Sequence, residues 1–418
     1  MPKLIINGAK KLKGKIQMHG AKNSTLPLMA ASLICGGECV FHNCPDLSDV
    51  DTAIKILRHL GCGAKREGSS VIINPITAKY YDIPDNLMRE MRSSIIFLGA
   101  IVSLFGKGVL SLPGGCELGP RPIDLHLSAL RKMGVEIQED HGCLNCTVPN
   151  GINGAQINLL FPSVGATENV IIAAAVSKGR TVISNAAREP EICDLADFLN
   201  SCGAKIYGAG SSTIEIEGVK HLTGCEHTVI PDRIAAATYL AAAAATGGTL
   251  TVSNIVAEHL APVVPPLEES GCALEFYNNN EVKITAPKRL KRIKSVRTMP
   301  YPGFPTDAQP PIMAMAALAD GTSIFVENIF ESRYKHVGEL LRLGANIKVE
   351  GRVAIVEGVK NLSGASVEAT DLRGGAAMVV AGLAAYGTTY VTGLHHLDRG
   401  YENIEKNFIS LGADIKRV

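Results

Sequence analysis

The segment GRTVISN at residues 179–185 begins with a glycine and continues with the β-branched, apolar composition of a strand. Variants of this segment recur at intervals of 66 to 73 residues, beginning at Gly37, Gly108, Gly179, Gly248, Gly321 and Gly387. A second phrase, in which a helix end is followed by a glycine and a strand, recurs at Gly61, Gly134, Gly203, Gly271, Gly344 and Gly412. Two independent phrases with one period predict six structural repeats of about 70 residues.

Within each repeat the same order of elements is predicted. A strand is followed by an amphipathic helix, a short strand pair and a second helix rich in Ala, Met and Leu. The second helices are expected to begin near Asn23, Arg92, Thr167, Arg233, Asp307 and Arg373. Because these helices are apolar on nearly every face, they should be buried. We therefore expect α/β domains with parallel helices at the centre and sheets outside.

Two proline pairs fall inside segments that the repeat predicts to be helical. They are Pro265-Pro266 and Pro310-Pro311. Because proline lacks the N–H that a helix interior requires, we expect these helices to start late or to kink.

The domain organisation follows from the two ends of the chain. The sixth repeat stops at Val418 without its last strand, whereas residues 4–16 match the pattern at 354–367. We infer that the first 20 or so residues complete the last repeat, so that both termini meet in one domain. Three repeats per domain then give one domain from 21 to 230 and a second from 1–20 plus 231–418. A chain that crosses twice between domains predicts a hinge, with the ligand site in the cleft.

Composition and charge exclude several classes of protein. The 418 residues include 41 basic and 40 acidic side chains, and 46% are hydrophobic, so the chain is globular and nearly neutral. A net charge of +1 gives no electrostatic reason to expect nucleic acid or an acidic membrane as a partner. The apolar stretch at 95–105 is shorter than the roughly 20 residues of a membrane span. With no secretory pattern at the start, we expect a cytoplasmic protein.

The eleven cysteines are expected to be reduced thiols, because the count is odd and the chain is long. Most are interpreted as inert, buried apolar residues: Cys35, Cys39, Cys44, Cys62, Cys193, Cys202, Cys225 and Cys272. The Cys143–Cys146 pair lacks a second pair at zinc spacing, which makes a metal site there a poor hypothesis. Motifs for P-loops, dinucleotide folds, zinc proteases and serine hydrolases are absent from the sequence.

Charged residues gather where the buried helices begin. Lys22, Arg92, Asp232-Arg233, Asp307, and Asp371 with Arg373 mark five of these starts, and the third helix begins with Ser163, Val164 and Gly165. Free N–H groups and the helix dipole at such positions favour phosphate and carboxylate ligands. At any single position a helix cap or an Arg–Asp pair is an alternative explanation. Recurrence at one place in the repeat favours an anion site.

One loop departs from the repeat pattern, namely PGGCELGPRPIDLH at 113–126. Its glycines give backbone freedom around Cys116. A nearby Arg121 would lower the pKa of this thiol, whereas the adjacent Glu117 would oppose that effect. A thiol with a near-neutral pKa could act as an acid or as a nucleophile.

Several longer motifs carry a resemblance to a known family. They are HGAKN (19–23), EMRSSIIFLGA (90–100), LPGGCELGPRPIDLH (112–126), PSVGATEN (162–169), NAAREPEI (185–192), PDR (231–233), PGFPTD (302–307), IFESRY (329–334), ATDLRGGAA (369–377) and HLDRGYE (396–402). Across all six repeats the chain resembles the UDP-N-acetylglucosamine enolpyruvyltransferase (MurA) family. The resemblance implies a pair of inside-out α/β barrels. It also implies transfer of the enolpyruvyl group of phosphoenolpyruvate to the 3-hydroxyl of UDP-N-acetylglucosamine through a tetrahedral ketal, the first committed step of peptidoglycan precursor synthesis.

The resemblance further implies roles for individual residues. Catalytic roles fall to Cys116 as proton donor, Asp307 as base, Lys22 and Arg399. Phosphoenolpyruvate would be bound by Lys22, Asn23, Arg121, Arg373 and Arg399. UDP-N-acetylglucosamine would be bound by Asn23, Arg92, Arg121, Pro122, Ile123, Asp124, Leu125, Ser163, Val164, Gly165, Asp307 and Ile329. The implied scheme requires neither a metal nor a cofactor.

Two other functions remain as alternatives. One is a relative with the same barrels that uses a shikimate phosphate acceptor, and Cys116 together with RPIDLH (121–126) argues against it. The other is a catalytically silent paralogue that binds sugar nucleotides, because fold alone does not prove activity. The presence of Lys22, Cys116, Asp307 and Arg399 argues against this second alternative.

Overall fold

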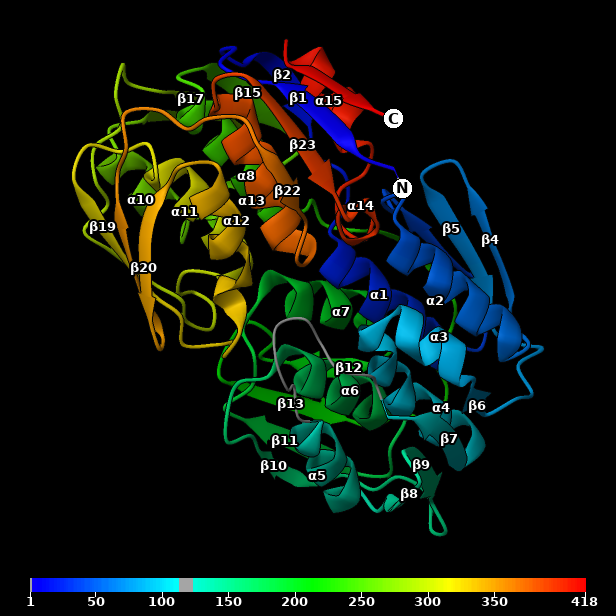
Figure 1. The fold of residues 1–418 in the computed structure, drawn as a ribbon. Coiled ribbons are helices and arrows are strands. Elements are labelled where there is room, and N and C mark those ends of the chain that lie inside the picture. Colours follow the sequence, from blue (N-terminus) through cyan, green and yellow to red (C-terminus); the bar gives the residue numbers. More distant parts are fainter. Residues whose placement is uncertain (1, 113–122) are drawn as a thin grey trace. The chain divides into compact units, whose positions relative to one another are not determined.

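The computed structural model describes residues 2–112 and 123–418, and these residues divide into two compact units. The central unit contains residues 20–112 and 123–230, and the terminal unit contains residues 2–19 and 231–418. In the described part of the chain, each unit holds three four-stranded sheets. Figure 1 shows helices enclosed by sheets within each unit.

The elements of the central unit follow the repeat. Its strands are β3 (Cys39–His42), β4 (Gly63–Glu67), β5 (Ser70–Asn74), β6 (Asp82–Ile83), β7 (Lys107–Ser111), β8 (Glu136–Asp140), β9 (Cys143–Thr147), β10 (Gln156–Asn158), β11 (Arg180–Ser184), β12 (Lys205–Tyr207), β13 (Thr213–Glu217) and β14 (Glu226–Thr228). Its helices are α1 (Lys22–Ala31), η1 (Ser32–Ile34), α2 (Ser48–His59), α3 (Asp85–Glu90), η2 (Arg92–Ile96), α4 (Phe97–Phe105), α5 (Asp124–Lys132), α6 (Val164–Ala175) and α7 (Pro190–Ser201).

The terminal unit repeats this plan. Its strands are β1 (Leu4–Asn7), β2 (Lys13–Gln17), β15 (Thr249–Ser253), β16 (Ala273–Tyr277), β17 (Glu281–Thr285), β18 (Ser295–Arg297), β19 (Thr322–Val326), β20 (Asn346–Glu350), β21 (Val353–Glu357), β22 (Ser366–Glu368), β23 (Thr388–Thr392) and β24 (Asp414–Arg417). Its helices are α8 (Arg233–Ala245), α9 (Ala257–Leu260), α10 (Val264–Glu269), η3 (Thr306–Ala308), α11 (Gln309–Ala316), η4 (Arg333–His336), α12 (Val337–Arg342), α13 (Leu372–Ala384), α14 (Leu394–Leu397) and α15 (Ile404–Ser410).

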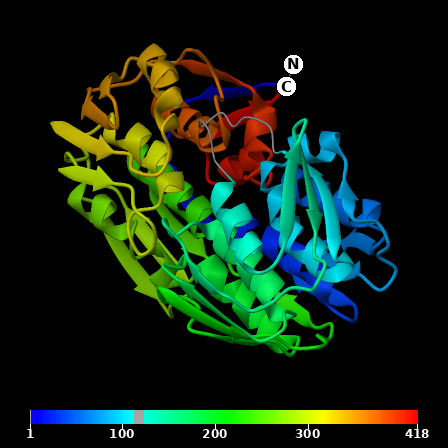
Figure 2. The same ribbon diagram turned by 90° about the horizontal axis from the view of Figure 1, so that it is seen from below.

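The predicted buried helices form the core of each unit. In the terminal unit, α8, α11 and α13 pack against one another and are buried along nearly their whole length. Sheets surround them, as Figures 1 and 2 show. The strands alternate buried and exposed side chains, as in β11 and β19, because only one face of each sheet meets the core helices. The expected arrangement, with helices inside and sheets outside, is confirmed.

One sheet illustrates how the repeat produces its topology. In the order β6-β7-β9-β8, β8 and β9 form an antiparallel hairpin, β7 pairs antiparallel with β9, and β6 runs parallel to β7. The hairpin turns through His141 and Gly142, both of which have positive φ. A two-residue turn of this kind matches the right-handed twist of the flanking strands.

The two ends of the chain lie in one sheet. β1 runs between β23 and β24 and is antiparallel to both, and Lys3 and Val418 exchange backbone hydrogen bonds of 2.8 and 2.9 Å. The N-terminal residues therefore supply a strand that the sixth repeat lacks. In the central unit, β14 pairs in parallel with β3, so the last strand joins the sheet of the first repeat and closes a ring.

Some details differ from the prediction. A strand of only two or three residues precedes several core helices, namely β6, β10, β14, β18 and β22. α6 begins at Val164, three residues before the expected start near Thr167. The proline pairs lie at the beginning of α10 and α11, where a missing N–H costs nothing, so the expected late start is confirmed. Among the described helices, none combines the length and the apolar character that crossing a membrane requires.

Candidate active site

In the terminal unit, Asp307 lies between two buried guanidinium groups. Its Oδ1 accepts a hydrogen bond from Arg333 Nη2 at 3.1 Å, and its Oδ2 accepts one from Arg373 Nε at 3.3 Å. The two arginine side chains are 1% and 2% exposed, whereas the Asp307 side chain is 27% exposed. The negative charge of the carboxylate is therefore balanced by the two guanidinium groups, while part of the side chain remains accessible to a ligand.

Arg373 is held at the beginning of a core helix. Asp371 caps α13, because its Oδ1 accepts hydrogen bonds from the backbone N–H groups of Arg373 and Gly374 at 3.0 and 3.1 Å. Burial opposes the charge of Arg373, but the nearby Tyr401 and the carboxylates of Asp307 and Asp232 raise its pKa. Its Nη1 is buried and has no hydrogen-bond acceptor among the described residues. A buried cation with an open N–H is suited to bind an anion.

Arg333 and Glu327 are site residues that the sequence interpretation missed. Arg333 Nη2 also donates to the carbonyl oxygen of Thr306 at 2.8 Å, which fixes the turn that carries Asp307. Glu327 accepts a hydrogen bond from Thr306 Oγ1 at 3.0 Å and another from the backbone N–H of Ile329 at 2.9 Å. The prediction had pointed to this part of the chain through Ile329 and the IFESRY motif, but it gave Arg333 and Glu327 no role.

The third core helix of the terminal unit begins beside the same cluster. Asp232 caps α8 by accepting hydrogen bonds from the backbone N–H groups of Ile234 and Ala235, both at 2.8 Å. Arg233 is buried, and its guanidinium lies 5.4 Å from the ring centroid of Tyr301. The charged residues predicted at the starts of α8, α11 and α13 are thus brought to one end of the helix core.

Arg399 lies in the turn that follows α14 and is half-buried. The turn approaches α13 closely, since a Cβ on Gly400 would come within 2.6 Å of a Leu372 side-chain atom. Asp398 is anchored by two hydrogen bonds from Arg417 on β24, at 3.0 and 2.7 Å. These contacts place Arg399 near the beginning of α13, the helix that carries Arg373.

In the central unit, Lys22 forms a buried ion pair. Its Nζ lies 2.5 Å from Oδ2 of Asp49, and the two side chains are 9% and 2% exposed. Lys22 is the first residue of α1, and Asp49 lies in the first turn of α2. Asn23, the next residue of α1, is exposed. Asp49 was not predicted, because nothing in the sequence marks it as the partner of Lys22.

The beginnings of α5 and α6 are joined through His126. Its Nδ1 accepts a hydrogen bond from Asn169 Nδ2 at 2.7 Å, and burial lowers its pKa to about 4, although Asp124 opposes this. The imidazole is therefore neutral at pH 7, with the proton on Nε2. A Cβ on Gly165 would lie 3.0 Å from His126 Cε1, so only glycine lets the start of α6 approach this ring without adjustment.

The remaining residues predicted to bind the nucleotide lie around these two helix starts. Ile123 and Leu125 are half-buried and Asp124 is exposed at the beginning of α5. Ser163 caps α6 by accepting a hydrogen bond from the N–H of Ala166 at 3.4 Å, and Val164 follows it.

Glu168, one turn into α6, was not predicted. Burial raises its pKa well above the usual range, with further contributions from Glu191 and Glu189. A buried acid with a raised pKa is a frequent feature of functional sites.

Four of the predicted residues receive no side-chain description. Cys116, Arg121 and Pro122 lie outside the described residues. Arg92 begins η2, but its side chain is likewise outside the description.

Comparison with known proteins gives a consistent result. The family model described as EPSP synthase (3-phosphoshikimate 1-carboxyvinyltransferase) matches residues 6–408. UDP-N-acetylglucosamine 1-carboxyvinyltransferase 2 of Caldanaerobacter subterraneus subsp. tengcongensis is 53% identical over 418 residues, covering 100% of both chains. UDP-N-acetylglucosamine 1-carboxyvinyltransferase 1 of Symbiobacterium thermophilum is 48% identical, covering 99% of this chain and 95% of the relative.

Solved structures share the whole fold. The enolpyruvyl transferase NikO from Streptomyces tendae superposes with a TM-score of 0.90 at 26% identity, covering 100% of this chain and 99% of that one. EPSP synthase from Acinetobacter baumannii superposes with a TM-score of 0.78 at 19% identity, with the same coverage, and this likeness concerns the fold alone. Because the family model spans residues 6–408 and relatives of about half identity cover the chain almost completely, the chain belongs to the EPSP synthase family of carboxyvinyltransferases.

Proposed function

We propose that this chain transfers the enolpyruvyl group of phosphoenolpyruvate to the 3-hydroxyl of UDP-N-acetylglucosamine and releases phosphate. Full-length relatives at 45–53% identity bear the name of this transferase, which supports the choice of acceptor. The observation that carries the chemistry is the Asp307 carboxylate, held by Arg333 and Arg373 and still partly exposed. This reaction would be the first committed step of peptidoglycan precursor synthesis, so its loss should impair cell shape and division.

In the proposed mechanism Asp307 is the base. As the 3-hydroxyl oxygen of the sugar bonds to C2 of phosphoenolpyruvate, Asp307 takes the hydroxyl proton and Cys116 donates a proton to C3. The resulting tetrahedral ketal then loses a proton from C3 and expels phosphate, which restores the carbon–carbon double bond. Fixing the carboxylate between two guanidinium groups keeps it oriented without reorganisation during the reaction.

We assign phosphoenolpyruvate to the cations Lys22, Arg121, Arg373 and Arg399, with Asn23 beside them. The Nη1 of Arg373 supports this assignment, because it is a buried donor with no hydrogen-bond acceptor among the described residues. Each hydrogen bond between charged groups of this kind contributes about 1.5–3 kcal/mol. Lys22 is pre-positioned by its ion pair with Asp49.

We assign UDP-N-acetylglucosamine mainly to the starts of α5 and α6. The N–H groups of Val164 and Gly165, beyond the Ser163 cap, would bind the diphosphate at a helix N-terminus. Ile123, Asp124 and Leu125 would contact the uracil together with Arg121 and Pro122, and Arg92 would add a cation. For the amino sugar we assign Asn23, Asp307 and the carbonyl oxygen of Ile329, because the N–H of Ile329 already donates to Glu327.

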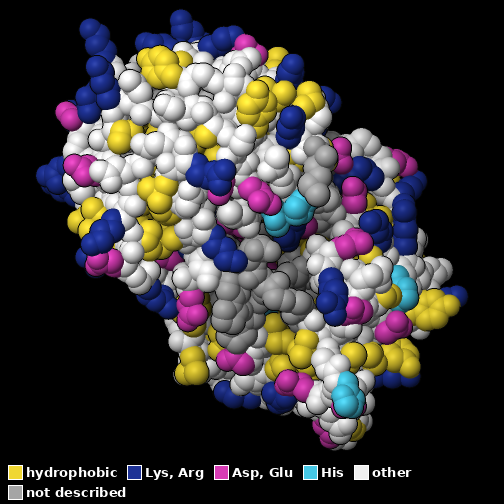
Figure 3. Space-filling model, in the orientation of Figure 1, with side chains coloured by type: hydrophobic (Ala, Val, Ile, Leu, Met, Phe, Trp, Pro, Cys, Tyr) yellow, Lys and Arg dark blue, Asp and Glu magenta, His cyan; other side chains and the backbone are white. Residues whose placement is uncertain are grey.

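We infer that this reaction takes place in the cytoplasm. We expect neither nucleic acid nor a membrane to be a partner. On the face shown in Figure 3, basic and acidic side chains are interspersed, which supports this expectation.

A phosphate-release assay with two acceptors tests the proposal. Phosphate should appear with phosphoenolpyruvate plus UDP-N-acetylglucosamine and not with phosphoenolpyruvate plus shikimate 3-phosphate. Release with shikimate 3-phosphate alone would support the other branch of the family. Release with neither acceptor, while UDP-N-acetylglucosamine still binds, would support the silent paralogue.

The role of Cys116 can be tested by alkylation. Each of the ten cysteines in the described residues is buried or half-buried, so we expect the epoxide fosfomycin, an analogue of phosphoenolpyruvate, to label Cys116 first. Peptide mapping that finds the label on another cysteine, with Cys116 unmodified, would exclude this assignment.

A further inference from the structure

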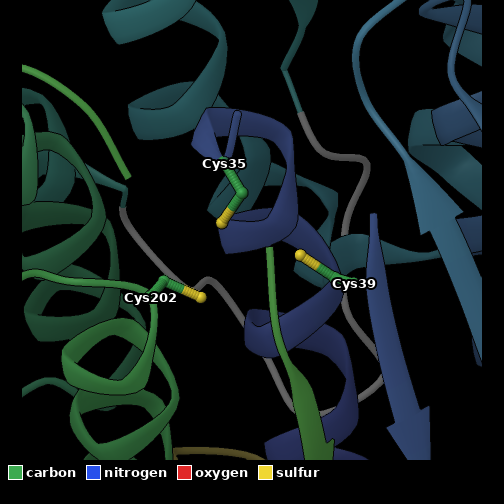
Figure 4. Close-up of side chains that lie close together, drawn as sticks. All are labelled: Cys35, Cys39 and Cys202. Atoms are coloured by element: carbon green, nitrogen blue, oxygen red, sulfur yellow. The ribbon is translucent and has the colours of Figure 1, made fainter. Parts of the chain in front are cut away.

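Four cysteines from three separate segments of the chain meet inside the central unit. The Sγ atoms of Cys35, Cys39 and Cys202 all lie within 4.8 Å of one another, and all three residues are buried. Figure 4 shows their sulfur atoms pointing into one shared space. The Sγ of Cys225 lies 3.3 Å from that of Cys202. Within the described residues this is the one group of potential metal ligands in such proximity.

The backbone around this thiol cluster (Cys35, Cys39, Cys202 and Cys225) is fixed by hydrogen bonds between its segments. Gly36 N–H donates to the carbonyl oxygen of Leu222 at 2.8 Å, and Val40 N–H donates to that of Cys225 at 3.0 Å. Thr223 N–H donates to the carbonyl oxygen of Cys202, also at 2.8 Å. The turn between Cys35 and Cys39, the loop before Cys225 and the end of α7 are thereby held together.

Glycines permit this close approach. A Cβ on Gly224 would lie 2.0 Å from the carbonyl oxygen of Glu38, and a Cβ on Gly36 would lie 2.8 Å from that of Leu222. Neither position could hold a larger residue without moving one of the two segments. The sequence CGGEC at 35–39 therefore suits two ligands on a tight turn, with the three-residue separation common among zinc-binding cysteines.

We propose that Cys35, Cys39, Cys202 and Cys225 bind one zinc ion. Zinc prefers four thiolates in a tetrahedron with Zn–S distances of about 2.3 Å, which sets the sulfurs about 3.8 Å apart. The sulfurs of Cys35, Cys39 and Cys202 already lie within 4.8 Å of one another, and that of Cys225 lies 3.3 Å from that of Cys202, so side-chain rotations can bring all four to this geometry. Four Zn–S bonds form, the four thiol protons pass to the solvent, and no sulfur is oxidised or reduced.

The proposed ion would close the ring of the central unit. Cys35 and Cys39 belong to the first repeat, whereas Cys202 and Cys225 belong to the third. The same two repeats are joined by the pairing of β14 with β3. Because Lys22 and Cys35 lie at opposite ends of the segment formed by α1 and η1, about 15 Å or more apart, the ion would stabilise the fold without taking part in catalysis.

Metal analysis of the full-length protein tests the proposal. Untagged protein, produced with zinc in the medium and purified with reductant but no chelator, should contain close to one zinc per chain. After zinc is removed, added Co²⁺ should bind with the thiolate charge-transfer and d–d absorption of a tetrahedral cobalt thiolate site. Removing the zinc should lower the melting temperature by roughly 5–10 °C.

Single variants locate the site. Cys202→Ser and Cys225→Ser should lose most of the zinc, and the partly exposed Cys225 serves as the alternative if the first variant does not fold. Cys62→Ser replaces a buried cysteine elsewhere in the same unit and should retain the metal. Cys116→Ser should retain it as well, which excludes binding by the proposed catalytic thiol.

Three results would overturn the proposal. The first is less than a tenth of a zinc per chain together with no cobalt thiolate bands from the reduced wild-type protein, a measurement that needs no variant. The second is zinc that stays bound in Cys202→Ser and Cys225→Ser. The third is a Cys202–Cys225 disulfide, found by non-reducing peptide mapping of freshly isolated protein, because those sulfurs could not then bind a metal.

Discussion

At the residue scale, the proposed chemistry depends on ion pairs in which at least one of the two side chains is buried. Asp307 would be a costly carboxylate without Arg333 and Arg373, and Lys22 would be a costly buried ammonium without Asp49. The sequence indicated Lys22, Asp307 and Arg373, because a charged residue at the start of an apolar helix stands out. It did not indicate Asp49 and Arg333, since they are 27 and 26 residues distant along the chain from Lys22 and Asp307 and follow no local pattern.

Replacing the base should separate catalysis from binding. Asp307→Asn keeps the size of the side chain but removes its ability to accept the hydroxyl proton. We expect turnover to fall by about 10²- to 10⁴-fold while the affinity for UDP-N-acetylglucosamine stays within a few-fold. Calorimetry and steady-state kinetics measure the two quantities. If nucleotide binding is lost while bound substrate still turns over normally, Asp307 is a binding residue and another group is the base.

The Lys22–Asp49 pair should influence both stability and donor binding. Lys22→Met leaves the buried Asp49 carboxylate with one charge partner fewer, which should cost about 3–5 kcal/mol of unfolding free energy and weaken phosphoenolpyruvate binding. In the double variant Lys22→Met/Asp49→Asn, most of the stability should return but the donor affinity should not. Urea unfolding and the KM for phosphoenolpyruvate distinguish these effects. Recovery of donor affinity in the double variant would assign Lys22 a purely structural role.

At the element scale, the sequence predicted the long elements and missed the short ones. Core helices such as α8 and α13 can be predicted because their sequences are apolar on nearly every face. A strand such as β6 has two residues, which is too few to show an alternating pattern, and it exists because β7 offers it a parallel partner. The thiol cluster was missed for a different reason, since Cys39 and Cys202 become neighbours only when the ring of repeats closes.

The contact between α5 and α6 offers a test at this scale. Gly165→Ala would place a Cβ 3.0 Å from the His126 ring, so the start of α6 must shift away from α5. Because the proposed diphosphate site uses N–H groups at this helix start, the KM for UDP-N-acetylglucosamine should rise about tenfold, with a smaller change in kcat. Gly338→Ala is the matched control, since a Cβ on that helical glycine would meet nothing within 4 Å. An unchanged KM for UDP-N-acetylglucosamine in Gly165→Ala would contradict the assignment of the diphosphate to the start of α6.

At the scale of the whole molecule, the repeat determines most of the architecture. Six copies of one pattern predicted the class of fold, and the position of β1 between β23 and β24 follows from the strand that the sixth repeat lacks. What the pattern could not predict is the closure of each ring by short parallel strands such as β14. That closure depends on hydrogen bonds between the backbone groups of two strands that are distant in the sequence, so the pattern of one segment cannot predict it.

The free energy of unfolding should depend on pH through buried titratable groups whose pKa differs between the folded and unfolded states, such as His336 and Glu168. His336 is fully buried, and its Nδ1 lies 3.0 Å from the carbonyl oxygen of Arg333. Burial lowers its pKa to about 4 and the charge of the Arg333 side chain adds to this effect, whereas Asp371 and the hydrogen bond to the Arg333 carbonyl oppose it. In the unfolded chain a histidine has a pKa of about 6.5, so the unfolded state binds more protons between these values. The stabilisation is complete above pH 6.5 and is lost progressively as the pH falls toward 4.

A histidine variant makes this dependence measurable. Between pH 6.5 and pH 5, His336 alone should cost the folded state about 2 kcal/mol, and His336→Asn should remove that part of the slope. Glu168 acts in the opposite direction. Its pKa is raised in the folded state, so the folded state gains stability relative to the unfolded state as the pH falls. The comparison must therefore be made between variants and not from the wild-type curve alone. His141→Asn, at an exposed side chain, is the control. Urea unfolding at pH 7 and pH 5 that gives His336→Asn and wild type the same loss of stability would show that His336 already carries a proton in the folded protein.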